Sequence, residues 1–359
     1  MIDQEIIRQR LKNQRLTPNQ FEKPEQVVAW LGAVQAQDYH GALWALGLRL
    51  RGSTQPGVEV AFQEGRILRT HVLRPTWHFV TPQDIRWMLA LTAPRVHKLN
   101  ESTYRIQGID SEVYKRSRKI IVKALQGEKQ LTRDELASLF ESSGIKIDNG
   151  LRLAYIIMRA ELDGIICSGP RRGKQFTYML LDERAPASNT LTKSEALAEL
   201  AARYFTSRGP ASVKDFAGWS GLSMADARTA LEAVNNKLES EEINGQTCWF
   251  PQTRTRGLPK SPFVYLLSIY DEYISGYKDR TAMDAGFSMQ LFAMGNALQF
   301  IIVMDGLVVG TWKRTIKKDA VLIELNYFKK LSRPEKLAVV NAADRYGEFL
   351  GLPVVLSGA

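Results

Sequence analysis

A short polar cluster, VQAQDYHG, follows an apolar helical stretch near the N-terminus and contains Gln35, Gln37, Asp38 and His40. A glutamine amide both donates and accepts hydrogen bonds but has no titratable proton, so it can orient a water molecule without acting as a base. Positions i and i+2 lie about 200° apart on a helix. Gln35 and Gln37 can therefore share a site only if the helix ends around them, as Gly41 suggests. The alternative is a set of polar residues at a helix terminus without a chemical role.

Other sources of chemistry are missing from the sequence. It contains no GxxxxGK[ST], GxGxxG, HExxH or GxSxG motif, which removes the common phosphate-binding, dinucleotide, zinc-protease and hydrolase signatures. Cys167 and Cys248 are far apart, and neither belongs to a CxxC pair. We therefore expect two partly buried thiols, with no disulfide framework, metal or organic cofactor.

The composition points to a globular protein with an anionic partner. Among 359 residues, 45% are hydrophobic, and 48 Lys and Arg against 38 Asp and Glu give a net charge of +10. This excludes wholesale disorder, and the length favours two or three domains. Nucleic acid is the obvious polyanion, although a basic, solvated surface is the alternative. No apolar stretch is long enough for a membrane span, and the charged N-terminus argues against secretion.

The segment from Leu131 to Leu181 has the order of a winged helix. Thr132 and Glu135 have capping-box spacing at the start of one helix, and a second helical segment ends at Gly164. Two short strands then surround a turn with basic residues at its tip. The second helix can enter a DNA groove, and the wing tip can reach phosphate through Arg171, Arg172 and Lys174.

The same order recurs on both sides of this segment. After the polar linker DERAPASNTLT, a third unit has capping boxes at Ser212 and Ser223 and a hairpin signal at Asn244-Gly245, although its wing is acidic. The N-terminal part is a further copy, in which ILRTHVLRPTWHFVT alternates like two strands. That wing contains Arg69, His71, Arg74 and His78.

The last hundred residues favour β-structure. They include SPFVYLLSIYDEYISGY, a hairpin at Asp305-Gly306 and a closing amphipathic helix. We therefore predict an α+β, helix-rich fold of tandem winged-helix (helix-turn-helix) domains followed by a C-terminal β-rich domain. The expected boundaries are 1–118, 119–188, 189–256 and 257–359.

Nearly the full chain resembles the AlkZ-like bacterial DNA glycosylases. The resemblance rests on VQAQD, GRILRTHVLRPTWHFVTPQDIRWML, FVYLLSIYDEYISGYKDR and MDGLVVGTWKRT. Its most specific element is a Gln-apolar-Gln motif, matched by Gln35-Ala36-Gln37; a sister branch has Asp at the second position. The resemblance implies tandem winged helices, unhooking of interstrand crosslinks, and catalytic roles for Gln35 and Gln37 in positioning the attacking water.

The resemblance also implies DNA contacts. His71, Arg74 and His78 would hold phosphates or an abasic sugar, with Arg69 beside them; the alternative is a wing stabilised by local hydrogen bonds. The C-terminal hairpin would enter a groove with Trp312, Lys313 and Arg314, unless Trp312 packs in the core and its neighbours are solvated. Asp271, Tyr273 and Asp279 would be scaffold, with Arg280 on DNA.

The leading hypothesis is a monofunctional DNA glycosylase that acts on cationic N-alkylpurines, including bulky adducts and crosslinks. A purine alkylated at N7 or N3 is already cationic, so its glycosidic bond breaks without strong acid assistance. We expect a monomeric bacterial cytoplasmic protein, associated with the nucleoid when bound to double-stranded DNA. The competing hypotheses are a non-catalytic winged-helix regulator and a protein-interaction scaffold.

Overall fold

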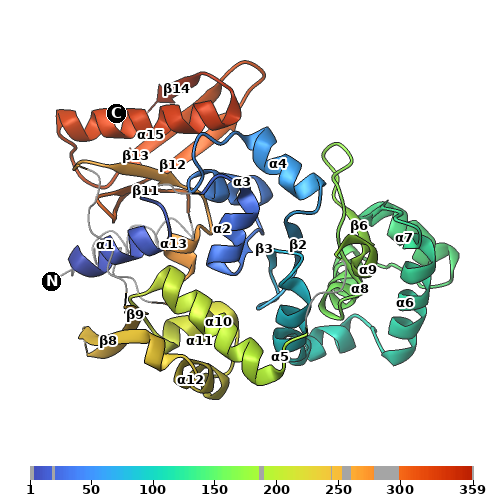
Figure 1. Ribbon diagram of the computed structural model, residues 1–359. Coiled ribbons are helices and arrows are strands. Elements are labelled where there is room, and N and C mark those ends of the chain that lie inside the picture. The colour runs from blue at the N-terminus through green and yellow to red at the C-terminus, as the bar shows by residue number, and fades with distance from the viewer. Residues whose placement is uncertain are drawn as a thin grey trace.

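The computed structural model describes residues 4–17, 21–185, 190–243, 245–252, 260–278 and 299–357. Helices dominate, and the largest sheet is built from the C-terminal part of the chain (Figure 1). The predicted α+β, helix-rich fold class is confirmed. Within these ranges, no helix has the length and apolar character needed to cross a membrane.

Three three-stranded sheets share one arrangement, in which a helix precedes a short strand, two helices and a hairpin. In each sheet, the last strand lies between the first and the second. The first copy has the strand order β1-β3-β2. Its elements are α2 (Pro24–Leu31), β1 (Val34–Gln35), α3 (Tyr39–Gly47), α4 (Gln55–Gln63), β2 (Leu68–His71) and β3 (Trp77–Val80).

The second copy follows the long helix α5 (Ile85–Ile106) and has the strand order β4-β6-β5. The predicted boundary at 118/119 falls inside its first helix, which packs against the next two helices. Its elements are α6 (Ser111–Leu125), β4 (Leu131–Thr132), α7 (Arg133–Ser142), α8 (Gly150–Leu162), β5 (Ile166–Ser168), β6 (Thr177–Leu180) and α9 (Leu181–Arg184).

The third copy has the strand order β7-β9-β8. Its hairpin has the register expected from the sequence, with Ile243 opposite Gln246; Asn244 lies outside the described residues. Its elements are α10 (Lys193–Arg208), β7 (Ala211–Ser212), α11 (Val213–Ser220), α12 (Met224–Glu232), the 3-10 helix η1 (Asn235–Lys237), β8 (Leu238–Ile243) and β9 (Gln246–Pro251).

Side-chain caps begin the helices where the sequence predicted them. Thr132 accepts from the backbone N–H of Glu135, whose carboxylate accepts from the N–H of Thr132. Ser212 and Asp215 form the same reciprocal pair at the start of α11. Each cap satisfies two backbone donors that the first turn of a helix leaves free.

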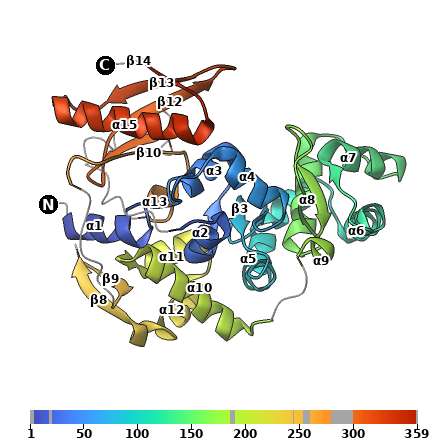
Figure 2. The same cartoon turned by 45° about the horizontal axis from the view of Figure 1, so that its top comes forward.

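The C-terminal part forms a five-stranded sheet in the order β10-β11-β12-β13-β14. Helix α15 lies against this sheet and also packs on α3 and α4, so the sheet and the first winged helix share one core (Figure 2). The elements are β10 (Val264–Leu267), α13 (Glu272–Ser275), β11 (Ile301–Met304), β12 (Leu307–Ile316), β13 (Val321–Tyr327), α15 (Arg333–Leu350) and β14 (Val354–Ser357); α1 (Gln4–Asn13) packs against α10.

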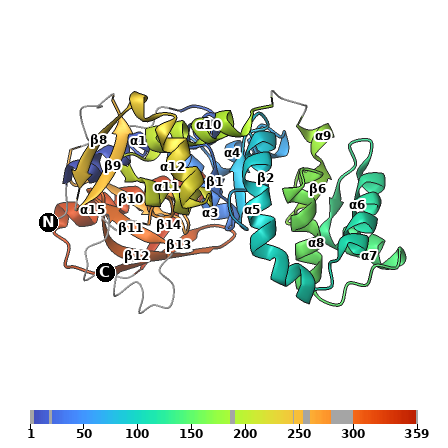
Figure 3. The same cartoon turned by 90° about the horizontal axis from the view of Figure 1, so that it is seen from below.

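Helix α8 corrects one expectation from the sequence. It is the second helix of its helix-turn-helix, the element that enters the major groove in many DNA-binding proteins. Here α8 packs against α5 and β2 and lies between α5 and α6 (Figure 3). Its Leu153, Ile156 and Ile157 are buried. The body of α8 is therefore covered by neighbouring elements, and only its first turn, at Gly150 and Leu151, is exposed and could contact DNA.

Candidate active site

Gln35 and Gln37 lie on an extended segment between α2 and α3. The helix ends at Leu31, and Gly32 adopts a φ of +77°, which a residue with a Cβ rarely adopts. Gln35, in β1, lies opposite His78 of β3. Gln37 lies two residues further along the chain, at a bend before α3. Both glutamine side chains nevertheless reach the same part of the wing, Gln35 at Arg74 and Gln37 at the backbone of Trp77. Gln35 is half-buried, whereas Gln37 is exposed.

The backbone of this motif is fixed at three points. Ala36 donates its N–H to the carbonyl of Trp77 (2.7 Å) and accepts at its own carbonyl from Nε of Arg69 (3.0 Å). Gln35 donates its N–H to Oε1 of Glu272 (3.0 Å). The motif is therefore held by the first winged helix on one side and by the C-terminal part of the chain on the other.

Both glutamine side chains accept a hydrogen bond. Nη2 of Arg74 donates to Oε1 of Gln35 (3.3 Å), and the N–H of Trp77 donates to Oε1 of Gln37 (3.4 Å). Each amide oxygen retains a second lone pair. Within the described part of the chain, neither amide nitrogen has a hydrogen-bond partner. The pair thus keeps donors and acceptors available for a water molecule or a substrate.

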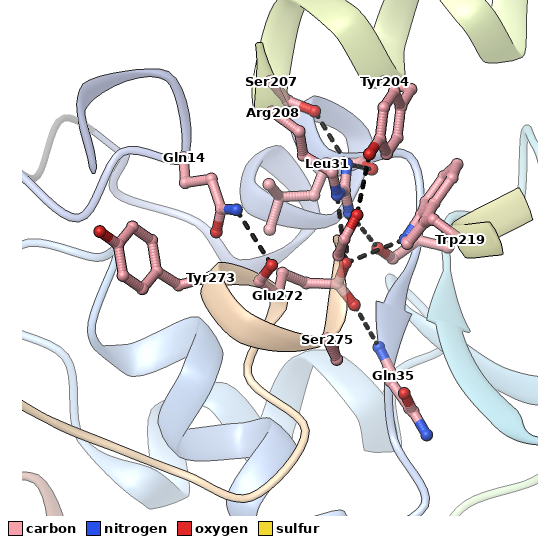
Figure 4. Close-up of polar contacts among 12 residues, drawn as sticks. Gln14, Leu31, Gln35, Tyr204, Ser207, Arg208, Trp219, Glu272, Tyr273 and Ser275 are labelled. Atoms are coloured by element: carbon pink, nitrogen blue, oxygen red, sulfur yellow. Dashed lines mark hydrogen bonds and ion pairs between the residues drawn. The ribbon is translucent and has the colours of Figure 1, made fainter. Parts of the chain in front are cut away.

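A buried polar network surrounds Glu272 (Figure 4). Its Oε2 accepts from Nη2 of Arg208 (2.6 Å) and from Nε1 of Trp219 (3.0 Å). The side chains of Glu272 and Arg208 are both 0% exposed. Sequence reasoning missed these three residues. The available signal was an acidic pair, Asp271-Glu272, in an otherwise apolar and aromatic run.

Arg69 is buried, which corrects the expectation that it contacts DNA. Its guanidinium lies 4.3 Å from the ring centroid of Trp77 and 4.5 Å from that of Phe176. Burial lowers the pKa of Arg69 to about 10, so the side chain remains a cation at neutral pH. Arg69 supports the carbonyl of Ala36 and has little surface to offer to phosphate.

His71 is also buried, and it joins two winged helices. Its Nδ1 lies 2.5 Å from Oε2 of Glu161 on α8, and its ring packs at a tilt against Trp77 at a centroid distance of 4.2 Å. The expected contact between His71 and phosphate is therefore wrong for this arrangement, because the imidazole is enclosed between β2 and α8.

His78 is 0% exposed, which likewise removes it from the surface that DNA could reach. Its Nδ1 bonds the carbonyl of Thr76 (3.0 Å), while its Nε2 has no partner in the described part of the chain. Burial, followed by the nearby charge of Arg74, holds the pKa of His78 well below its usual range. The ring is therefore neutral at pH 7, with its proton on Nδ1.

Arg74 is the residue of this wing that reaches the motif. Besides contacting Gln35, its Nη1 donates to the carbonyl of Gly218 in α11 (3.2 Å). Burial lowers the pKa of Arg74, and the charge of Glu272 partly offsets this shift. Contact between Arg74 and DNA remains a prediction.

The wing of the second winged helix, residues 169–176, extends beside α4 (Figure 1). Arg171 pairs with Glu59 of α4 at 2.8 Å, and Arg172 pairs with Glu135 at 2.7 Å. Lys174 is exposed. Two of the three wing cations therefore already have carboxylate partners within the chain. Contact of this wing with phosphate remains a prediction.

Trp312 lies in the core, which corrects its predicted DNA contact. It is 1% exposed, and its Nε1 donates to the carbonyl of Leu267 (2.9 Å). Its ring packs edge-on against Phe300 and Tyr346. The physical reason is the position of β12, which is the central strand of its sheet and not a free hairpin arm.

The residues after Trp312 are more accessible. Lys313 is exposed, and Arg314 is half-buried with its Nη2 3.8 Å from Oδ1 of Asp38. Burial, followed by the charges of Arg171 and Arg314, lowers the pKa of His40. The wing of the second winged helix and strand β12 thus both approach the start of α3, directly after Gln37. Arg280 lies outside the described residues.

The described ranges contain no group of three or more His, Cys, Asp or Glu side chains placed to hold a metal ion. Cys167 and Cys248 are both buried. The carboxylate that contacts the backbone of the motif, Glu272, already accepts from Arg208, Trp219 and Gln35.

Comparison with known proteins identifies the relatives of this chain. The family model "DNA glycosylase AlkZ-like" matches residues 28–349, a range that includes the Gln-Ala-Gln motif. The chain belongs to the AlkZ-like DNA glycosylase family. As an AlkZ-like protein it is a DNA glycosylase, an enzyme class that hydrolyses N-glycosidic bonds.

A curated sequence and a solved structure, both from Streptomyces sahachiroi, are similar to this AlkZ-like chain. A protein named "Interstrand DNA cross-link repair glycosylase" is 23% identical over 318 residues, which cover 85% of each chain. The solved structure of DNA glycosylase AlkZ covers 99% of each chain with a TM-score of 0.81 and 22% sequence identity. At that identity, the structural similarity establishes the fold alone.

Proposed function

We propose that this AlkZ-like protein is a monofunctional glycosylase for cationic N-alkylpurines in double-stranded DNA, including bulky adducts and interstrand crosslinks. The observation that carries the proposal is that two neutral amides, Gln35 and Gln37, extend from a segment whose backbone is fixed and both contact the wing at Arg74 and Trp77. Such a pair can orient one water molecule toward an anomeric carbon.

The proposed reaction suits amides better than carboxylates. The oxygen of the water forms a bond to C1′ while the N-glycosidic bond breaks, and the bonding electrons neutralise the cationic ring of the purine. The proton of the water passes to solvent. Because the leaving group is already cationic, the enzyme needs orientation and electrostatic stabilisation but no strong acid. A neutral base such as uracil would be a poor substrate.

A lyase step is not part of the proposal. Cleavage of the DNA strand by a glycosylase through a Schiff base requires an amine nucleophile close to C1′. Among the described residues, the cation that contacts the glutamines is Arg74, whose guanidinium is a poor nucleophile. The expected product is therefore an intact strand with an abasic site.

The name of the curated relative supports the crosslink part of the proposal, since that protein is called an interstrand cross-link repair glycosylase. A crosslinked base cannot be extruded freely from a duplex, because it remains attached to the opposite strand. A substrate of this kind would have to be attacked without complete base flipping.

The test is release of base from matched duplexes that contain one N7-methylguanine, one uracil or one N7-linked interstrand crosslink. We expect release from the first, none from the second, and conversion of the third into separable strands. Absence of release from both alkylated duplexes would refute the proposal. Strand scission without added base or heat would refute its monofunctional part.

A further inference from the structure

Within the described residues, strand β1, which carries Gln35, has one free edge, an edge with which no other strand pairs. Its sheet has the order β1-β3-β2, so β3 pairs with only one side of β1. The N–H of Ala36 points to β3 and meets the carbonyl of Trp77. Successive backbone groups of a strand point in opposite directions, so the N–H of Gln35 and the carbonyl of Ala33 point away from β3.

An ion pair occupies this free edge. Oε1 of Glu272 accepts from the N–H of Gln35 (3.0 Å), and Nη2 of Arg208 donates to the carbonyl of Ala33 (3.2 Å). Nη1 of Arg208 also donates to the carbonyl of Leu31 (2.7 Å), at the end of α2. The carboxylate therefore takes the place of a strand carbonyl, and the guanidinium takes the place of a strand N–H.

We propose that Glu272 and Arg208 are positioning residues that act as a substitute neighbouring strand for β1 and thereby fix Gln35 in its reactive position. This inference rests on the proposed function for its catalytic part. Figure 4 shows the side chain of Gln35 extending away from Glu272, so the carboxylate acts on the backbone and leaves the amide free.

The use of charged groups has a physical reason. A carboxylate is a stronger acceptor than a peptide carbonyl, and it can accept from several donors together. Glu272 does so, because Arg208 and Trp219 occupy Oε2 while Gln35 occupies Oε1. Both members of the ion pair are fully buried, and loss of one would leave an uncompensated charge in the interior. Replacement of the Glu272 carboxylate by an amide of the same shape should therefore disrupt these hydrogen bonds.

The ion pair of Glu272 and Arg208 also affects Arg74, which donates a hydrogen bond to Oε1 of Gln35. Arg74 lies close enough to Glu272 for the carboxylate charge to stabilise the guanidinium. Glu272 thus supports Gln35 twice, at the backbone N–H directly and at the side-chain oxygen through Arg74.

The chain provides a matched control in the adjacent residue. Asp271 forms a buried ion pair with Arg49, with both oxygen contacts at 2.9 Å, and it also lies at the start of α13. Arg49 donates further to the carbonyl of Ala45 and to Gln14. None of these contacts involves Gln35. Asp271→Asn should therefore weaken the fold to a similar extent without moving the motif.

The experiment compares Glu272→Gln with Asp271→Asn in the full-length protein. In Glu272→Gln, the amide NH2 must face either the N–H of Gln35 or the donors of Arg208 and Trp219, so one contact becomes repulsive. Two quantities are measured at a temperature where both variants are folded. One is the amide hydrogen exchange of a peptide that contains Gln35, and the other is the single-turnover rate of base release from an N7-methylguanine duplex.

We expect Glu272→Gln to exchange the Gln35 amide about tenfold faster than Asp271→Asn. We also expect it to release base more slowly by about tenfold or more, because a small displacement of a reacting group has a large effect on rate. Duplex affinity should stay within about twofold of the wild type. Equal exchange and equal rates in the two variants would overturn the proposal.

Two further outcomes are separable. If Glu272→Gln does not fold, the experiment uses Arg208→Lys instead. A single ammonium cannot donate to the carbonyls of Leu31 and Ala33 and to Glu272 at the same time. A rate of base release equal to that of Asp271→Asn would again overturn the proposal. If the wild type releases no base, the proposed function fails. The exchange measurement then still decides whether the ion pair holds β1.

Discussion

Arg74 donates from Nη2 to Oε1 of Gln35, and from Nη1 to the carbonyl of Gly218 in α11. The guanidinium thus links the side chain of the first motif glutamine to the third winged helix. Because the contact is made to the amide oxygen, the NH2 group of Gln35 is directed away from Arg74. The orientation of the uncharged Gln35 side chain is therefore set by a cation in the wing of the same winged helix.

Replacement of the motif glutamines should abolish most base release without loss of DNA binding. Gln35→Ala and Gln37→Ala should each reduce the single-turnover rate by about 100-fold or more, and the double variant should be little worse than the poorer single one. The reason is that both amides act on one water molecule. Rates on an N7-methylguanine duplex, together with duplex affinity and melting temperature, provide the measurement.

Substitutions at Gln37 show whether the rate depends on a hydrogen bond to water or only on the volume of the side chain. Gln37→Asp can still hold water, so it should retain activity, with an acidic limb in its pH profile that the wild type lacks. Gln37→Leu has similar volume but cannot bind water and should be inactive. A wild-type rate in Gln37→Leu would contradict the assignment and make Asp38 the next residue to test.

Arg74 should affect the rate more than the stability. Arg74→Met removes the donor to Gln35 while retaining an aliphatic chain, and we expect a loss of about 10-fold to 100-fold in single-turnover rate. Arg74→Lys should recover part of that loss, since an ammonium can donate to either Gln35 or Gly218 but not to both in the same geometry. If Arg74→Met retained the wild-type rate but bound duplex weakly, Arg74 would be a DNA contact alone.

His78 should make the fold sensitive to acid. Its pKa in the folded protein lies well below the ordinary value of 6.5 because the ring is buried. Below about pH 6.5 the unfolded chain therefore binds a proton that the folded chain does not, and stability falls as pH falls, by up to about 1.4 kcal/mol per pH unit. Above that range the contribution is constant. Unfolding in urea at several pH values measures the effect.

The control for this prediction is His78→Asn, which can still donate to the carbonyl of Thr76 but does not titrate. Its stability at neutral pH should be lower than that of the wild type, because the smaller side chain leaves a cavity. The decline between about pH 6.5 and pH 5 should nevertheless be shallower in the variant. Parallel curves for the two proteins would show that His78 is not the group responsible.

Helix α6 should contribute more to the salt dependence of DNA binding than the wing does. The helix exposes Lys115, Arg118, Lys119 and Lys123, which have no ion pair among the described residues, whereas Arg171 and Arg172 are paired internally. The slope of log affinity against log salt reflects the number of counterions released on binding. Changing these four residues to Gln should reduce that number by up to about four. Changing Arg171, Arg172 and Lys174 should have a smaller effect. Duplex titrations between about 50 and 200 mM salt test the order, and the reverse order would contradict it.

Local signals allowed the sequence to predict the elements correctly. A capping box such as Thr132 with Glu135, or the hairpin turn Asp305-Gly306 with φ values of 51° and 85°, is decided by neighbouring residues alone. The tandem winged helices followed from three repetitions of such signals. The resemblance to a family motif also predicts Gln35 and Gln37 as the catalytic residues, and this role stays a prediction.

Contacts between segments that are distant in the sequence explain which site residues the sequence could not predict correctly. The sequence places His71, His78 and Trp312 in strands but does not say which face another domain will cover, so all three were predicted to contact DNA. Glu272 was missed because its partners lie 237, 64 and 53 residues away. The packing of α8 against α5 could not be predicted from the sequence for the same reason. The amphipathic pattern of α8 is equally compatible with a DNA groove and with a protein neighbour.

The 237-residue interval between Gln35 and Glu272 matters during synthesis of the chain. Chains generally fold in order as they emerge from the ribosome, but the first winged helix shares its core with the C-terminal sheet, which is synthesised last. Until then, the free edge of β1 has no partner for the N–H of Gln35. A nascent or truncated protein would therefore lack both part of that core and an assembled hydrolytic centre. Excision of bases would begin only when translation has delivered the last part of the chain.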